Sequence, residues 1–485
     1  MKSSIKEILL AGIVLGVIVF VLNVASCASN QNIQETPKTE TVEKKTESQK
    51  KPKKEYTKEG FMELLQHTLD TDGAEAALSL YETELPKNYS KFKNDFDLLF
   101  LKAAICVSAN KLDEAQSLCD ELSKKDSKNQ DVIGLSATIA KMRGDKAGRD
   151  KQVKALLAED PYNSMANIEV AEDYFNRKNY KQARLSYKKA LVREPKNEDA
   201  LRGLGQTEYY LEDDENAKAT FNKLLEVNPT SVQAYLYLGK LAFANNEYKI
   251  ASDNAKKAVE LDPSNYECHM DYGLYERNLG HFDVALAEWT KSIEIQPDYF
   301  LAYAYRAGLY DEQDKAAEAI ADYKSVIKLN PKYYYAYESI GVLALHEEQW
   351  TTAREAFMKC REFNTTNVSY PLMITYCYYK EGKGPEAKKF SDSVLRKMDR
   401  NTIEYTMLRL FHDRAGEKPV PQKIAALGNR NTQGKMYYYL ALFYDMFGGG
   451  EFANQYYTKV LDMKSPMFFE YRLAEWRMKG KVPLK

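Results

Sequence analysis

A step of 34 residues runs through most of the chain. Six prolines keep it: Pro161, Pro195, Pro229, Pro263, Pro297 and Pro331. A series of small residues also keeps it: Ala171, Gly205, Gly239, Gly273, Ala307 and Gly341. Another series contains only alanine: Ala183, Ala217, Ala251, Ala285, Ala319 and Ala353. A further series is bulky at every position but one: Tyr187, Phe221, Ala255, Trp289, Tyr323 and Phe357. Chance does not align such series, so one structural unit is repeated.

The physical content of this step is a helical hairpin. Two helices of about 12–14 residues and two short turns use about 34 residues. The small residues fall on the first helix and the alanines on the second, where larger side chains would push the two backbones apart. Proline cannot continue a helix, so it ends each unit. With only 23 glycines and 15 prolines in 485 residues, the sequence predicts an all-α chain of stacked hairpins.

At this point the chain resembles the tetratricopeptide repeat (TPR) family. The segment "AEDYFNRKNYKQARLSYKKALVREP" carries the family pattern at these positions: Ala171, Tyr174, Ala183, Tyr187, Ala190 and Pro195. The resemblance implies a right-handed α-solenoid of about eleven hairpins that binds protein partners along a concave face. It implies nothing about which partner is bound.

The repeat frame divides the chain into regions. Divergent repeats are predicted at 58–163, well-matched repeats at 164–367 and divergent repeats again at 368–467. Within the last region, residues 402–433 match poorly. Residues 468–485 are predicted to form a capping helix.

The capping helix is expected to be amphipathic. Phe469, Leu473 and Trp476 fall on one helical face, as expected for contact with the last repeat. The polar residues fall elsewhere: Glu470, Glu475 and Lys479.

Residues 1–27 resemble a bacterial lipoprotein leader. An apolar run from Ile8 to Leu22 is followed by Val24-Ala25-Ser26-Cys27. The resemblance implies cleavage before Cys27 and lipidation of its thiol. The alternative is an uncleaved anchor helix in which Cys27 is incidental. Both interpretations leave the rest of the chain outside the cytoplasm, because basic flanks stay inside.

Residues 28–56 are predicted to be a disordered, charged tether. Ile33 and Val42 are their only aliphatic side chains larger than alanine, too few to offset the entropy cost of ordering. Such a tether holds a folded region away from a membrane.

Charge and chemistry exclude several function classes. With 69 basic and 70 acidic side chains, there is no strong field to attract nucleic acid. The five histidines share no spacing, and no catalytic, metal-binding or cofactor-binding motif is present, so no enzyme, metal or cofactor is predicted. Cys106 and Cys119 face each other within one predicted hairpin, either as buried thiols or as a disulfide.

Four tyrosines crowd into "YYYAY", residues 333–337. In the repeat frame, Tyr337 is a core position, and Tyr333 and Tyr334 belong to the turn. The family resemblance places Tyr335 on the concave face. The partner-binding residues predicted in this way are Phe175, Arg202, Tyr209, Phe243, Met270, Tyr335, Tyr376 and Tyr379. The alternative is that neighbouring first helices bury much of this face.

The sequence therefore favours a membrane-tethered, extracytoplasmic scaffold of the bacterial envelope. Its expected partner is an extended or helical apolar protein segment. The alternative is an accessory or small-molecule-binding subunit of an envelope enzyme or transporter complex, in which residues 402–433 would line a pocket.

Overall fold

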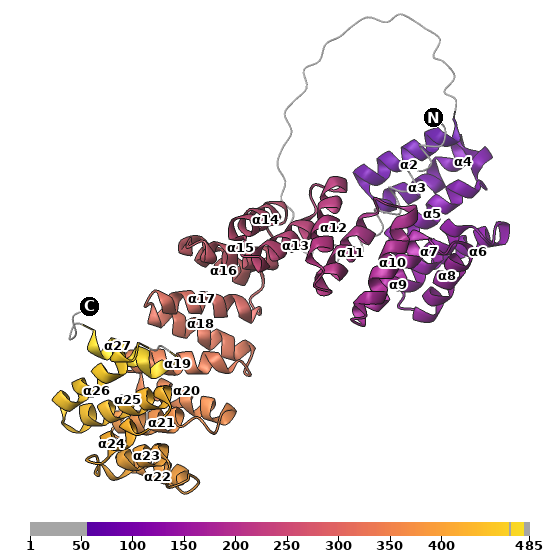
Figure 1. Ribbon diagram of the computed structural model, residues 1–485. Coiled ribbons are helices and arrows are strands. Elements are labelled where there is room, and N and C mark those ends of the chain that lie inside the picture. The colour runs from indigo at the N-terminus through magenta and orange to yellow at the C-terminus, as the bar shows by residue number, and fades with distance from the viewer. Residues whose placement is uncertain (1–55, 465–466, 480–485) are drawn as a thin grey trace, which may run out of the picture. The chain divides into compact units, whose positions relative to one another are not determined.

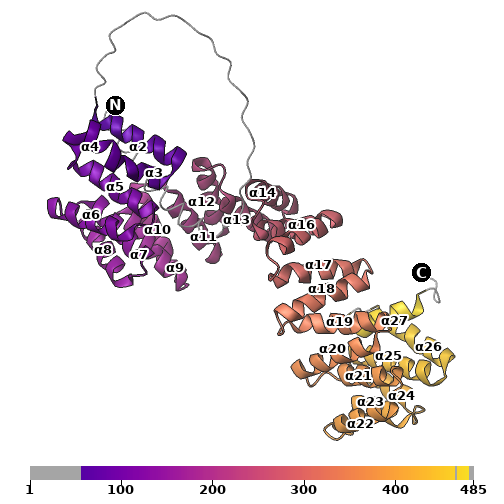
Figure 2. The same cartoon turned by 180° about the vertical axis from the view of Figure 1, so that it is seen from behind.

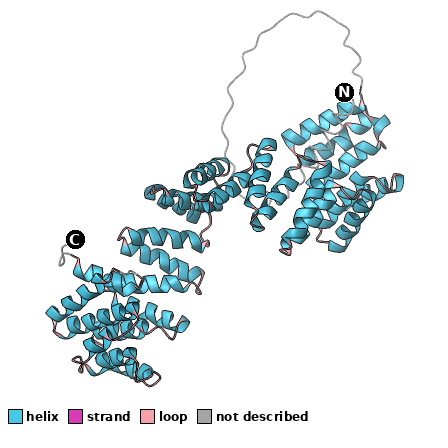
Figure 3. Ribbon diagram, in the orientation of Figure 1, coloured by secondary structure: helices cyan, strands magenta, loops and turns pink. Residues whose placement is uncertain are grey.

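The computed structural model describes residues 56–464 and 467–479. Over these ranges the chain is helical and has no strand (Figure 3). The predicted leader, its lipidation site at Cys27 and nearly all of the predicted tether lie outside the described residues.

The chain divides after Pro229 into two compact units, and Figure 1 labels the helices of both. The helices of unit 1 are α2 (Lys58–Asp72), α3 (Ala74–Thr83), α4 (Leu85–Asn88), the 3-10 helix η1 (Ser90–Phe92), α5 (Phe96–Ser108), α6 (Leu112–Lys125), α7 (Gln130–Met142), α8 (Lys146–Glu159), α9 (Ser164–Asn176), α10 (Tyr180–Arg193), α11 (Glu198–Tyr210) and α12 (Asp214–Val227).

Unit 2 begins at Thr230. Its helices are α13 (Val232–Ala244), α14 (Tyr248–Leu261), α15 (Tyr266–Asn278), α16 (Phe282–Ile295), α17 (Phe300–Glu312), α18 (Ala316–Leu329), α19 (Tyr334–His346), α20 (Trp350–Phe363), α21 (Ser369–Lys380), α22 (Gly384–Leu395), α23 (Ile403–Asp413), α24 (Val420–Ala425), α25 (Arg430–Phe447), α26 (Gly450–Asp462) and α27 (Phe469–Met478).

Consecutive helices pair as antiparallel hairpins, as the 34-residue step predicts. The described part of the chain contains eleven full hairpins: α2/α3, α5/α6, α7/α8, α9/α10, α11/α12, α13/α14, α15/α16, α17/α18, α19/α20, α21/α22 and α25/α26. The poorly matching segment 402–433 holds α23 and the short α24. Val420 and Ile424 of α24 are fully buried in the core, so this segment packs as part of the solenoid.

The hairpin turns share one backbone conformation. The residue with positive φ recurs every 34 positions: Asn110, Gly144, Lys178, Glu212, Asn246, Gly280, Asp314, Glu348 and Gly382. Glycine adopts this left-handed conformation at little cost, whereas other residues are strained there. Three of these nine positions are glycine, so at the others the packing of the hairpin enforces the turn.

The first helices α7, α9, α11, α13 and α15 begin with a recurring cap. The cap side chains each accept a hydrogen bond from a backbone N–H of the first turn: Asn129, Asn163, Asn197, Ser231 and Asn265. Such caps satisfy otherwise unpaired N–H groups at the helix start.

The core confirms the small and alanine series. All six alanines of the second-helix series are fully buried. A Cβ atom on Gly205 would lie 2.8 Å from the Phe221 ring, and one on Gly273 would lie 2.7 Å from the Trp289 ring. Glycine is therefore needed where an aromatic ring from the second helix packs against the first.

One repeat solves the same packing problem differently. Where the bulky series carries Ala255, the ring of Tyr275 packs against Gly239, at 3.3 Å from a hypothetical Cβ. Tyr275 comes from α15 of the following hairpin and is buried, and it stacks on Phe243 at 5.0 Å between ring centroids. The ring of Tyr275 on α15 thus fills the space that the small side chain of Ala255 on α14 leaves beside Gly239.

Candidate protein-binding surfaces

The tyrosine-rich stretch forms part of a continuous ring cluster in unit 2. We call it the aromatic edge and define it as Phe300, Tyr333, Tyr334, Tyr335, Tyr337 and Phe363. It gathers the start of α17, the start of α19 and the end of α20. The Tyr334 and Tyr335 centroids are 4.4 Å apart, and those of Tyr337 and Phe363 are 6.0 Å apart.

Exposure separates these rings. Tyr335 is 63% exposed, whereas Tyr333, Tyr334 and Tyr337 are half-buried. Phe363 at the end of α20 is also exposed. The structure therefore places Tyr335 at the surface, in contact with the half-buried rings of Tyr333 and Tyr334.

The same edge breaks the capping rule of the preceding repeats. Tyr333 of the aromatic edge occupies the cap position of α19 and makes no capping hydrogen bond. The same is true of Tyr299 at α17, which lies outside the edge and packs on Tyr266 with ring centroids 4.9 Å apart. Losing such a cap costs roughly 1 kcal/mol. Positions where the sequence departs from the residue that favours the local structure concentrate at functional sites. Here an aromatic ring stands where the preceding repeats have a capping side chain.

A second aromatic cluster lies in unit 1, at the ends of α9 and α11. Phe175 packs on Tyr180 and Tyr210 with centroids 5.3 and 5.6 Å apart, and Tyr209 adjoins Tyr210 at 5.6 Å. Phe175 and Tyr209 were predicted partner-binding residues, and both are half-buried. The more exposed member is Tyr210, at 48%, which the repeat frame did not single out.

Three other predicted residues are packed or paired. Arg202 is half-buried and forms an ion pair with Asp199 one turn earlier. Phe243 is half-buried beneath the stacked ring of Tyr275. Met270 is only 5% exposed, so its prediction as a surface residue is wrong.

The burial of Met270 has a simple cause. It packs in a core cluster with Trp289 of α16 and Leu309 of α17. The Trp289 Nε1 also donates to the Met270 carbonyl at 3.3 Å, so Met270 lies in the core of its own hairpin.

The side chains of Tyr376 and Tyr379 on α21 contact neighbouring helices of the same chain. Burial raises the pKa of Tyr376, which packs edge-on against Trp350 at 5.8 Å. The Tyr379 hydroxyl donates to the Phe411 carbonyl at 2.9 Å. Both side chains therefore hold α21 to its neighbours, and neither is a freely presented anchor.

The C-terminal helix α27 lies against helices far earlier in unit 2. It contacts α19 as well as α25 and α26, and it lies beside α19 in both views (Figures 1 and 2). Arg472 reaches Asp311 of α17 with 2.6 Å between Nη1 and Oδ1. Trp476 stacks on His346 with centroids 4.2 Å apart. The helix thus covers the C-terminal end of α19.

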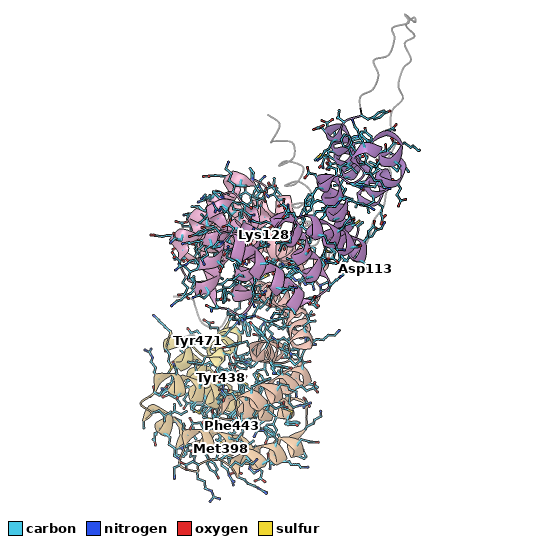
Figure 4. All side chains as sticks on the ribbon, turned by 90° about the vertical axis from the view of Figure 1, so that its right-hand side faces the viewer. Asp113, Lys128, Met398, Tyr438, Phe443 and Tyr471 are labelled. Atoms are coloured by element: carbon cyan, nitrogen blue, oxygen red, sulfur yellow. The ribbon has the colours of Figure 1, made fainter. Side chains whose placement is uncertain are left out.

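The polarity expected for this helix needs one correction. Glu475 and Lys479 are exposed, but Glu470 is fully buried, because the helix is covered on more than one side. The Tyr439 hydroxyl of α25 donates to Glu470 Oε1 at 2.7 Å. Tyr438 and Phe443, labelled in Figure 4, lie on the same helix α25.

The two cysteines of the hairpin α5/α6 are not bonded to each other. Cys106 and Cys119 are free, buried thiols, and burial raises the pKa of each to about 11, which disfavours the reactive thiolate. No set of three or more His, Cys, Asp or Glu side chains within 56–464 and 467–479 could hold a metal ion. No described helix is both long enough and apolar enough to span a membrane.

A small hollow lies between α2, α5 and the start of α7. It measures about 110 Å³ and is lined by Met62, Phe96, Asp97, Phe100, Leu101, Asn129 and Asp131. Small-molecule pockets typically measure roughly 300–1,000 Å³. This hollow is therefore smaller than a typical small-molecule pocket, and it lies away from residues 402–433, where the alternative places a pocket.

Stacked antiparallel hairpins of 34 residues with small–aromatic contacts define an α-solenoid of the repeat class. The tetratricopeptide repeat family matches the chain at residues 169–230, 205–266, 238–300, 270–333 and 306–359. Residues 169–359 of the chain are therefore tetratricopeptide repeats. Repeats of this family suggest a scaffold for protein–protein interaction. No curated protein matches the chain in sequence.

Solved structures resemble parts of the chain. MamA is 25% identical, with 34% of this chain and 95% of MamA covered and a TM-score of 0.31. YrrB, described as a TPR protein with an unusual peptide-binding site, is 22% identical over 41% and 97% of the two chains, with a TM-score of 0.33. A tetratricopeptide repeat protein from Parabacteroides merdae is 20% identical over 50% and 97%, with a TM-score of 0.37.

Proposed function

We propose that the protein is a membrane-tethered, extracytoplasmic scaffold of the bacterial cell envelope that binds an apolar segment of a partner protein on the aromatic edge. The observation that carries this proposal is Tyr335, an exposed ring held in place by packed neighbours. A rigid aromatic anchor loses little entropy on contact and excludes much water. The proposal assigns the chain a binding role and no catalytic one.

The chemistry of the edge selects the kind of partner. Its rings are apolar, and its exposed members Tyr335 and Phe363 lie at the ends of helices. An apolar side chain of the partner would bury surface against both rings, and the Tyr335 hydroxyl would remain at the rim. Extended or helical apolar segments fit this description, whereas the near-neutral charge of the chain disfavours nucleic acid.

A photo-crosslinking amino acid at position 335 tests the proposal. Crosslinks should map to one apolar segment of a single envelope protein. The same group at Val192, an exposed position on the second helix α10, is the control and should give no such product.

A peptide of the crosslinked segment then allows a quantitative prediction. Tyr335→Ala should weaken peptide binding by about 1–3 kcal/mol with the melting temperature unchanged. Tyr337→Ala removes a half-buried ring and should mainly lower stability. Equal melting losses for both variants, with unchanged peptide binding by Tyr335→Ala, would show that the whole cluster is packing.

The membrane anchor has its own prediction. It rests on Val24-Ala25-Ser26-Cys27 after the apolar run, and on a charged tether long enough to span about 30 Å. Labelled palmitate should be incorporated by the wild-type chain, and Cys27→Ser should abolish the label. A mature N-terminus at Met1, or equal labelling of the variant, would leave the uncleaved helix as the anchor.

A further inference from the structure

The C-terminal helix α27 is attached to a surface that belongs to much earlier repeats. Arg472 of α27 and Asp311 of α17 are 161 positions apart in sequence, and Arg472 also donates to the Asp311 carbonyl at 3.0 Å. Val342 and Leu345 of α19 are buried, and they share a hydrophobic core cluster with Leu473 and Ala474 of α27. The chain's own helix therefore covers part of the surface at the C-terminal end of α19.

The contacts at this surface follow a short recognition pattern. Arg472 pairs with Asp311 and approaches Asp314 at 3.9 Å. One turn later Trp476 stacks on His346, and the Arg472 guanidinium lies 4.1 Å from the Trp476 ring centroid. The arginine of α27 therefore binds an acidic site on and just after α17. The aromatic residue four positions later stacks on an aromatic side chain of α19.

The attachment of α27 also has features of a replaceable contact. The helix has ten residues, and helices this short are marginal in water without a docking surface. Arg472 and Asp314 keep substantial solvent exposure. The helix also brings the Glu470 carboxyl into a fully buried position, which carries a desolvation cost.

We propose that the surface formed by Asp311, Asp314 and His346 is a helix-docking site, which α27 occupies as an internal ligand. A partner's amphipathic helix with an arginine and an aromatic residue four positions later takes the place of α27. The site lies at the C-terminal end of α19, whereas the aromatic edge lies at its N-terminal end. Either surface can therefore fail its test without the other.

The test uses the full chain and a labelled synthetic peptide of residues 467–479 as the probe. In the wild type, α27 competes with the peptide and the apparent affinity is reduced by the fraction of sites already occupied. Arg472→Glu combined with Trp476→Ala in the chain should release α27, and the peptide should then bind about tenfold more tightly or better. Glu475→Lys, an exposed change on the same helix, should leave peptide binding at the wild-type level.

Specificity is checked by charge reversal. Adding Asp311→Arg to a chain in which α27 is released by Arg472→Ala and Trp476→Ala, which leaves no acidic side chain at position 472 to pair with the new arginine, should abolish binding of the wild-type peptide. A peptide that carries Arg472→Glu should bind the Asp311→Arg chain better than the wild-type peptide does. This exchange distinguishes docking at Asp311 from adhesion of an aromatic peptide elsewhere.

Amide hydrogen exchange decides the remaining outcomes. Loss of protection confined to α27 in the double variant, together with tighter peptide binding, supports the proposal. Released α27 without tighter binding would overturn it, as would α27 that stays protected, or loss of protection throughout unit 2, which would make α27 an integral part of the core. A dimer that exchanges α27 between two copies would also overturn it, because a second copy would then be the occupant.

Discussion

Tyr275 shows how a single side chain can complete the packing of a neighbouring repeat. In other repeats the space beside the first-helix glycine is filled by an aromatic residue 16 positions later, as with Gly205 and Phe221. In the repeat that carries Gly239, that position is Ala255, and Tyr275 supplies the ring. The residues one repeat before and after Tyr275 are Leu241 and Leu309, so the extra ring appears where the usual one is missing.

A double-mutant cycle tests this exchange. Tyr275→Ala should lower the free energy of unfolding by about 3–5 kcal/mol, because it leaves a buried cavity. Ala255→Phe alone should cost about 1–3 kcal/mol, because the space is already full. The double variant should lose less than the sum by roughly 1–3 kcal/mol. Strict additivity in denaturant unfolding would mean that the two side chains do not share one space.

At this scale the sequence predicts burial better than exposure. The periodic alanines and the core role of the bulky series follow from sequence spacing, because a hairpin interface is local. Tyr335 is exposed as its frame position suggests, whereas Met270, at another predicted partner-binding position, is buried in a core cluster with Trp289 and Leu309. The distance between neighbouring first helices depends on contacts between repeats, so the sequence of a single repeat does not predict it. The left-handed backbone at Lys178, Glu212 and Glu348 is likewise enforced by packing and carries no glycine signal.

Among the elements, α27 departs most from a simple end cap. Of its predicted apolar face, Leu473 is buried, whereas Phe469 and Trp476 are half-buried. Its second contact, with α17 and α19, joins segments far apart in sequence, and no local pattern encodes it. The main free-energy cost of placing α27 here is the desolvation of the Glu470 carboxyl. Burial raises the pKa of Glu470, against the opposing effects of Lys435 and the hydroxyls of Ser369 and Tyr439.

The raised pKa predicts a pH-dependent attachment of α27. A carboxyl whose pKa is higher in the folded state contributes stability below its unfolded pKa, and this contribution is lost as pH rises through the folded pKa. Glu470→Gln keeps the shape and stays neutral, so it should increase hydrogen-exchange protection of α27 at pH 7.5 and leave it nearly unchanged at pH 4. Glu475→Gln, at an exposed position, should have no effect. Lower protection of α27 in Glu470→Gln at every pH would contradict this account.

On the scale of the whole molecule, the chain consists of two compact units with a boundary after Pro229. Within each unit, a hairpin contacts chiefly its neighbours along the chain. The stability of such an array is approximately the sum of repeat and nearest-neighbour contributions. A local defect should therefore remain local.

Matched substitutions in the two units test this expectation. Ala183 of unit 1 and Ala319 of unit 2 are fully buried equivalents, so a glutamate at either would bury a charge at a cost of several kcal/mol, about 3 or more. Ala183→Glu should reduce amide protection chiefly in unit 1, and Ala319→Glu chiefly in unit 2. Lys181→Glu, at an exposed position on α10, should change little. Equal losses in both units from either substitution would mean that the chain unfolds as one block.

The ion pair between Arg472 and Asp311 has a consequence for how this chain can change in length. Arrays of this kind gain and lose whole repeats. One repeat inserted or deleted between α17 and α27 would shift Asp311 by a full hairpin and separate it from Arg472. A repeat added before α17 would leave their interval of 161 positions intact. In descendants of this sequence that keep the ion pair, the number of repeats should therefore vary on the N-terminal side of α17 and stay constant beyond it.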